Sequence, residues 1–77
     1  MGIAHYYFHI LDEGTSVLDD EGMMLSRQAA RAELRASARD LTNARMRLGR
    51  GPGDGLIQLM DGDGQVLETC RFRTVLH

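Results

Sequence analysis

The chain has 77 residues, a net charge of −2 and one cysteine, Cys70. At this size folding hides only about 60% of the surface that the unfolded chain exposes, so the core is thin. One cysteine excludes an intrachain disulfide framework, and no apolar run approaches the roughly 20 residues that span a bilayer. The first residues carry none of the features of a secretory signal. We therefore expect one small domain, residues 1–77, in a reducing, cytoplasmic environment.

The charges are distributed unevenly along the chain. All nine basic residues are arginine, and six of them lie between Ser26 and Leu48 against two acids, so that this segment carries +4. The segments on either side carry −6. A basic element between acidic segments either binds a polyanion or is neutralised within the fold.

Residues 3–11 predict the first strand, because aromatic and β-branched residues alternate between two faces. One face carries Ala4, Tyr6, Phe8 and Ile10, and the other carries His5, Tyr7 and His9. The first, more apolar set should face the core. Residues 12–16 have the composition of a turn, and residues 17–18 predict a short return strand that completes a hairpin. Residues 19–22 then break the pattern, and residues 23–25 lead to a helix.

A helix is predicted from Ser26 to Leu48. Ser26 is a good N-cap, since its hydroxyl can accept from an unpaired amide of the first turn, and Gly49 can adopt the left-handed conformation that ends a helix. The helical repeat predicts one inner stripe, with Ser37 at its margin. Its members are Ala30, Leu34, Ala38, Leu41, Ala44 and Leu48. Half of them are alanine, which allows close approach to a sheet.

The C-terminal third predicts a second hairpin. Residues 50–55 form a flexible connector, and residues 56–60 and 65–75 are strands joined by the glycine-containing turn 61–64. The whole chain is then an α+β domain in the order ββαββ. We expect a four-stranded antiparallel sheet of two hairpins, in strand order 2-1-3-4, with one long helix packed on one face.

Four arginines of the helix, which we call the arginine row, follow an i, i+4 spacing and form one ridge. They are Arg27, Arg31, Arg35 and Arg39. No acid stands four residues from any of them, so they lack intrahelical partners. Such a row can bind phosphates, or it can be a solvated face that meets the acids of residues 19–21 or a partner subunit. The acidic net charge and the lack of a basic tail favour the second interpretation.

The outer face of the first strand is a second candidate surface, formed by His5, Tyr7 and His9. Simple alternation along residues 65–75 adds Arg71 and Arg73 to this face. A sheet surface of this kind can stack bases, or the tyrosine can pack on a symmetry-related copy. The two histidines cannot chelate one ion alone, because residues four apart in a strand are about 13 Å apart.

The acidic turns and Cys70 give little indication of catalysis. The turn at residues 61–64 begins like a calcium loop, but its twelfth position is Phe72 rather than glutamate. Residues 19–21 could hold magnesium, although such runs are more often solvated near a helix start. Cys70 has no neighbouring histidine, and no P-loop, nucleophile elbow or dinucleotide motif is present. We therefore predict no catalytic residue, no metal site and no cofactor.

Several stretches together resemble a family of short proteins of unknown function from rhizobium-like alphaproteobacteria. They are residues 6–9, 19–22, 29–33, 37–41 and 61–67, and Phe72. In that family a proline commonly precedes this phenylalanine, where the present chain has Arg71. The resemblance implies a stand-alone cytoplasmic domain with no assigned activity, cofactor or catalytic residue. It also directs attention to the acidic turn, whose acids could fold back onto Arg27 or Arg31.

We expect a non-catalytic protein-interaction module, not an enzyme. It would form a homodimer or bind another protein through the exposed sheet face or the arginine row. One alternative is a nucleic-acid-binding regulator that uses the arginine row. The other is a small metal-dependent hydrolase with its metal at residues 19–21. No membrane partner is expected.

Overall fold

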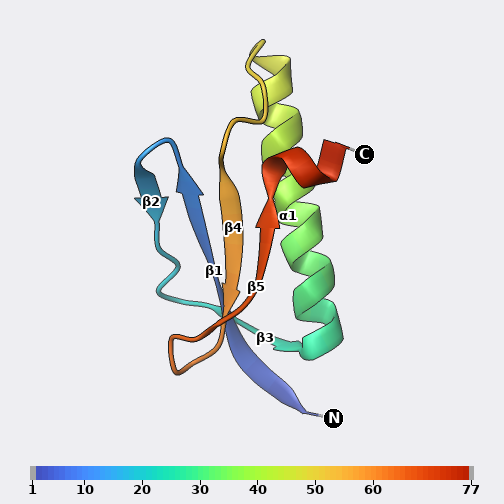
Figure 1. The fold of residues 1–77 in the computed structure, drawn as a ribbon. Coiled ribbons are helices and arrows are strands. Elements are labelled where there is room, and N and C mark those ends of the chain that lie inside the picture. Colours follow the sequence, from blue (N-terminus) through green and yellow to red (C-terminus); the bar gives the residue numbers. More distant parts are fainter. Residues whose placement is uncertain (1, 77) are drawn as a thin grey trace.

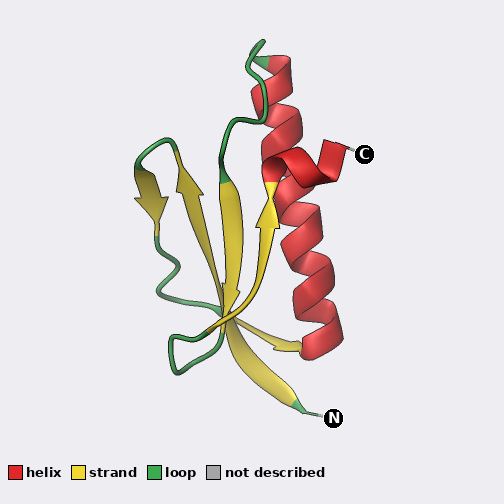
Figure 2. Cartoon of the chain, viewed as in Figure 1, coloured by secondary structure: helices red, strands yellow, loops and turns green. Residues whose placement is uncertain are grey.

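The computed structural model describes residues 2–76, which form an antiparallel sheet with one long helix against one face (Figure 1). In chain order the elements are β1 (Ile3–Asp12), β2 (Thr15–Val17), β3 (Met23–Ser26), α1 (Arg27–Arg47), β4 (Leu56–Met60), β5 (Val66–Arg71) and a short 3-10 helix, η1 (Phe72–Leu76). The predicted α+β class is confirmed (Figure 2). No helix in this part of the chain is long and apolar enough to cross a membrane.

The strand order is β2-β1-β4-β5, as predicted for two hairpins whose first strands are neighbours. β4 pairs with β1 from Tyr7↔Met60 to Leu11↔Leu56 and leaves the first residues of β1 without a partner on that strand. β3 pairs with this part of β1, from Ile3↔Ser26 to Tyr6↔Met23. The sequence predicted only a connection at residues 23–25. These residues do lead directly into the helix, and they also form a strand, which gives backbone groups of β1 hydrogen-bond partners.

The first hairpin closes through a tighter turn than the sequence predicted. Glu13 and Gly14 both have positive φ angles, of 50° and 78°, as a two-residue type I′ turn requires. The return strand therefore begins at Thr15, which the sequence placed in the turn. Leu18, predicted in the strand, lies beyond its end and is 66% exposed.

Helix α1 begins and ends where the capping residues predicted. The Ser26 hydroxyl accepts a hydrogen bond from the Ala29 amide at 3.1 Å. At the other end Gly49 has a φ of 76°, and the amide of Leu48 still reaches the carbonyl of Ala44. Both ends therefore satisfy backbone groups that have no partner within the helix.

The inner stripe of α1 differs from the prediction in its second half. Its buried residues are Ala30, Leu34, Ala38, Thr42 and Arg45. Leu41 and Ala44 are only half-buried, and Leu48 is 74% exposed. The Thr42 hydroxyl lies 2.7 Å from the carbonyl oxygen of Ala38 and 3.3 Å from that of Phe72. A polar side chain can occupy the inner face because its hydrogen bonds are satisfied there.

The core lies between α1 and the inner face of the sheet. Its buried hydrophobic residues are Tyr6, Ala30, Leu34, Ala38, Ile57, Leu59 and Phe72. The sequence predicted a strand through residue 75, but β5 ends at Arg71 and the chain turns into η1. This turn places Phe72 in the core, where it is 1% exposed.

Gly55 provides a test of this packing. A methyl group on Gly55 would overlap the ring of Phe72 and lie 3.1 Å from Asp12 Oδ1. Since the ring is enclosed, we expect Gly55→Ala to lower the free energy of unfolding by about 1–3 kcal/mol, measured by urea denaturation. Gly62→Ala is the control, because nothing lies within 4 Å of the added carbon. Equal stability of the two variants would contradict the close contact of Gly55 with Phe72.

Candidate interaction surfaces

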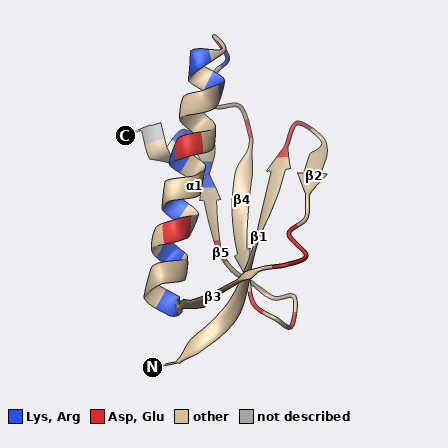
Figure 3. Cartoon of the chain, turned by 180° about the vertical axis from the view of Figure 1, so that it is seen from behind, with Lys and Arg blue, Asp and Glu red and all other residues tan. Residues whose placement is uncertain are grey.

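The arginine row lies on the side of α1 that borders β5. All four members are exposed. Arg31 donates from Nε to Glu68 Oε2 at 3.3 Å, and its Nη2 lies 3.3 Å from Oε1. Within residues 2–76 the other three make no ion pair. In Figure 3 the basic residues follow α1, whereas most acidic segments lie in the turns. Most of the row is therefore not neutralised within the described fold.

Three hollows lie beside this row, and residues of β5 line two of them. Arg27, Arg31 and Arg35 line a hollow of about 890 Å³ at the start of the helix. Arg35 also lines a second hollow of about 370 Å³ together with residues 68–71 of β5. A third, of about 120 Å³, shares Arg27, Arg31 and Glu68 with the other two. We call these three hollows together the arginine groove.

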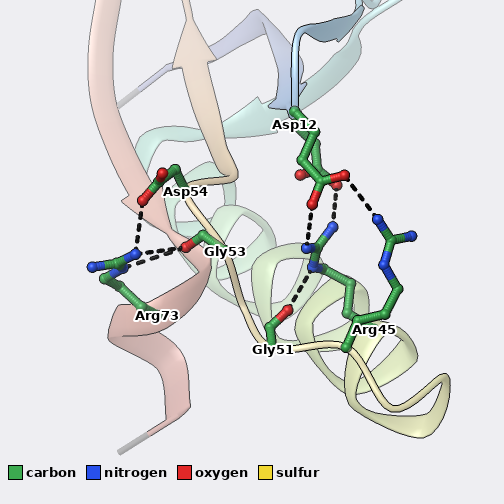
Figure 4. Close-up of polar contacts among 8 residues, drawn as sticks. Asp12, Arg45, Gly51, Gly53, Asp54 and Arg73 are labelled. Carbon is green, nitrogen blue, oxygen red and sulfur yellow. Dashed lines mark hydrogen bonds and ion pairs between the residues drawn. The ribbon is translucent and has the colours of Figure 1, made fainter.

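Arg45 is buried, with 8% of its surface exposed. Its Nη1 donates to Asp12 Oδ2 at 2.7 Å, its Nη2 to Glu13 Oε1 at 2.9 Å and its Nε to the carbonyl of Gly51 at 2.9 Å (Figure 4). Arg50 also bonds Glu13, at 2.8 Å. The hydrogen bond from Arg45, followed by the charge of Arg50, holds the pKa of Glu13 below its usual value.

This cluster joins the end of β1 to a distant part of the sequence, namely the end of α1 and the connector that directly follows it. From the sequence, Arg45 was recognised only as one of the six arginines of the helical segment. Its position seven residues after Ala38 places it on the inner face of the helix. The adjacent acids Asp12 and Glu13 at the end of a strand were the other signal, but only the fold brings them to Arg45.

Arg73 does not lie on the sheet as simple alternation predicted. It follows the end of β5, and its guanidinium donates to the carbonyl of Gly53 at 3.0 Å and to Asp54 at 2.7 Å. Arg71 does lie in β5, opposite Leu56, which in turn pairs with Leu11. Because residues directly opposite share a face, only Arg71 joins the face of Tyr7 and His9.

His5, Tyr7 and His9 lie on the face of β1 away from the helix, as predicted, and two of them interact with each other. The rings of His5 and Tyr7 are stacked, with centroids 5.2 Å apart and planes 7° apart. His5 Nε2 lies 2.7 Å from the carbonyl oxygen of Glu21. A side chain at Gly22 would overlap both rings. His5 and Tyr7 therefore hold the acidic turn against β1.

Asp19 organises that turn through its carboxylate. Oδ2 accepts from the Phe8 amide at 3.2 Å, and Oδ1 accepts from the amides of Glu21 at 3.2 Å and Gly22 at 3.0 Å. These bonds, that of Gly22 most of all, lower the pKa of Asp19. The carboxylate thus provides a partner for β1 between β2 and β3.

The predicted return of the acidic turn onto Arg27 or Arg31 is wrong. Within residues 2–76, none of the acids at positions 19–21 forms an ion pair with an arginine. The physical reason is the sheet topology. The turn follows β2 at one margin of the sheet, whereas the arginine row borders β5 at the other.

Comparison with known families gives a match over residues 5–73 to a domain of unknown function, DUF6894. The chain belongs to this family. The match covers the helix and all of the strands except the first two residues of β1, and it agrees with the resemblance to proteins of unknown function. Neither the curated proteins nor the solved structures contain a match.

Asp61 and Cys70 of this DUF6894 domain occupy positions that the fold explains. In the described part of the chain, no three His, Cys, Asp or Glu side chains gather where they could hold a metal ion. Asp61 Oδ1 accepts from the amides of Asp63 at 2.9 Å and Gln65 at 3.0 Å, so it shapes the turn of the second hairpin. Cys70 is a half-buried free thiol whose pKa is raised, chiefly by burial.

The lowered pKa of Asp19 predicts that the stability of the DUF6894 domain falls in acid. The stabilisation by the Asp19 carboxylate is complete above the pKa of an unfolded aspartate, near 3.9, and is lost as the pH falls through the folded-state pKa. We expect Asp19→Asn to lower the free energy of unfolding by about 1–2 kcal/mol at neutral pH, because the new amide group confronts the Phe8 N–H. Chemical denaturation at several pH values measures this.

The difference between wild type and Asp19→Asn should shrink as the pH falls below the Asp19 pKa. Asp20→Asn is the control, since Asp20 is exposed and makes none of these bonds. A constant difference at every pH would contradict the role of the ionised carboxylate.

Arg45 allows a comparison of buried and exposed arginines of the same helix. Arg45→Gln removes the partner of Asp12 and Glu13, so we expect it to lower the Tm. Arg47→Gln removes the same charge from an exposed position and should leave the Tm nearly unchanged. Thermal unfolding followed by circular dichroism distinguishes the two. Equal Tm values would show that the cluster adds nothing to stability.

Proposed function

We propose that this DUF6894 domain is a non-catalytic protein-interaction module that forms a homodimer through the outer face of its sheet and works in the cytoplasm. The single observation that carries the proposal is that α1 covers only one face of the sheet (Figure 1). We define the outer face by the residues that the β1–β4 and β4–β5 pairings place away from α1. They are Tyr7, His9, Leu11, Leu56, Gln58, Met60, Val66, Thr69 and Arg71.

The composition of the outer face suits self-association. Five of its nine residues are large and apolar or aromatic, including Tyr7, Met60 and Val66, and Val66 is 47% exposed. Tyrosine and methionine are enriched in protein interfaces. Burial of this face between two copies would add apolar contacts to a domain whose own core is thin.

The distribution of charge favours a second copy on this face. Arg71 is the only member of the outer face with a formal charge at neutral pH. A two-fold interface brings the same surface patch of each copy together, and like charges that meet across an interface are unfavourable. The arginine row would repel its own copy, whereas the outer face has little charge to repel.

The environments of three side chains that often act in catalysis, His5, Asp19 and Cys70, support a non-catalytic role. His5 and Asp19 are engaged in hydrogen bonds that shape the turn at residues 19–22. The pKa of Cys70 is raised, whereas a nucleophilic cysteine has a lowered pKa. The cytoplasmic assignment rests on Cys70 as well, because a free thiol stays reduced in that compartment.

Light scattering of the purified protein tests the dimer. We expect twice the mass of one chain at high micromolar concentration. Val66→Glu, which places a charge on the outer face, should give a monomer, because two like charges would meet in the dimer. Leu48→Glu is the matched control, since Leu48 is 74% exposed at the end of α1. A wild-type monomer at all concentrations would overturn the proposal.

Nucleic-acid binding is the competing outcome. Fluorescence anisotropy with duplex and single-stranded oligonucleotides at low salt should show no binding by wild type. Affinity that falls steeply with salt, as phosphate contacts require, would favour the regulator that uses the arginine row instead of the interaction module.

A further inference from the structure

The free edge of β5 forms one wall of the arginine groove. β5 is the last strand in the sheet order, and within residues 2–76 it pairs with β4 alone. Residues 68–71 line the same hollow although they are consecutive in the chain. Since successive side chains of a strand point to opposite faces, a hollow that touches all four lies along the strand edge. An exposed edge offers unpaired N–H and C=O groups to another strand.

The spacing of the arginine row matches an extended chain. Residues four apart in an α-helix rise by about 6.0 Å along the axis. Every second residue of a strand is about 6.6–6.8 Å farther along. A strand added to β5 would turn every second side chain towards α1, so acids at alternate positions would meet successive arginines. The small mismatch per step is within the reach of the flexible arginine side chains over three positions.

The contact of Arg31 with Glu68 shows how the groove binds a carboxylate. Arg31 approaches both oxygens of Glu68, each at 3.3 Å. Arg31 is exposed, and an exposed ion pair of this kind is weak. Among residues 2–76, Glu68 is the only acid that lines these hollows, against Arg27, Arg31, Arg35 and Arg71. The groove therefore has an excess of positive charge for an incoming acidic segment.

We propose that the arginine groove binds an extended acidic segment of a partner protein, which adds as a strand to the free edge of β5. Strand addition supplies main-chain hydrogen bonds, and the arginines supply specificity for alternate acids. A nucleic acid has no backbone that completes a sheet edge, and the protein's net charge of −2 opposes a long polyanion. This proposal goes beyond self-association because it uses the edge of β5 and the arginine row, although Thr69 and Arg71 belong to both surfaces.

A synthetic peptide provides the direct test. The probe is a fluorescein-labelled seven-residue peptide with glutamate at alternate positions and threonine or valine between them. We expect it to bind, by fluorescence anisotropy, more tightly than a peptide of the same composition with contiguous glutamates. N-methylation of the backbone amides that would face β5 should abolish binding. Equal binding of the contiguous or methylated peptide, or no binding of the alternating one, would overturn the proposal.

Arg35 and Arg47 give charge-matched variants for the same assay. Arg35→Glu reverses a charge that lines the groove, and we expect it to weaken binding by about tenfold or more, as loss of a charge-assisted contact implies. Arg47→Glu reverses an exposed charge outside the lining residues and should retain most of the affinity. Circular dichroism confirms that both variants fold. Equal losses of affinity in the two variants would mean that the peptide responds only to the overall charge of the protein, and would overturn the proposal.

Alkylation of Cys70 gives a second test of where the peptide binds, because Cys70 is the single thiol of the chain and lines the groove. We expect saturating peptide to slow alkylation of Cys70, and unchanged alkylation during binding would place the peptide elsewhere and overturn the proposal. Met60→Glu places a charge on the outer face from β4 and leaves β5 unchanged, so we expect it to give a monomer and to separate this result from the dimer. Peptide binding by the monomeric variant shows that the groove acts independently of self-association, and its loss there would refute that independence.

Discussion

The backbone of β1 requires hydrogen-bond partners along ten residues, yet each neighbouring strand is shorter than β1. Three parts of the chain provide these partners along one side of β1. β2 and β3 pair with the two ends of β1, and between them the Asp19 carboxylate accepts a hydrogen bond from the Phe8 amide. β4 pairs with the second half of β1. The chain that joins β2 to α1 must therefore follow β1, and this path fixes where the helix begins.

A second constraint acts at the opposite end of the domain, where charge is neutralised inside the fold. Arg45 connects the end of α1 with the acids at the end of β1, and Arg50 shares one of those acids. The charges of this helix therefore have two kinds of environment. Arg45 is enclosed by its partners, whereas most of the arginine row faces solvent beside an open strand. One helix thus combines a structural arginine with a candidate binding surface.

Local signals in the sequence were sufficient for much of the fold. Alternation along residues 3–11, the Ser26 cap and the glycine turns predicted the main strands, the helix and the strand order. The sequence could not reveal β3, because residues 23–25 form a strand only when the long β1 leaves backbone groups unpaired. It could not reveal the end of β5 at Arg71 either, since that end depends on the burial of Phe72 against Gly55.

The candidate surfaces were predictable to a similar extent. The i, i+4 spacing of the arginines and the alternation of His5, Tyr7 and His9 gave the correct faces. What each residue contacts required the fold. Thr42 and Arg45 were assigned to no inner position, because hydrophobic pattern alone assigns polar residues to solvent, and the partners that permit their burial come from distant segments. The absence of contact between the acidic turn and the arginine row likewise follows from topology.

The two margins of the sheet also differ in how they limit aggregation. At one margin β2 is three residues long and β3 is four residues long, and the Asp19 carboxylate binds β1 between them, so each strand there offers few backbone groups to another molecule. Such short edge strands are a known protection against edge-to-edge growth. At the other margin β5 offers six residues. Because open-ended growth needs two complementary edges on each molecule, a strand added at β5 ends the sheet and does not begin a filament.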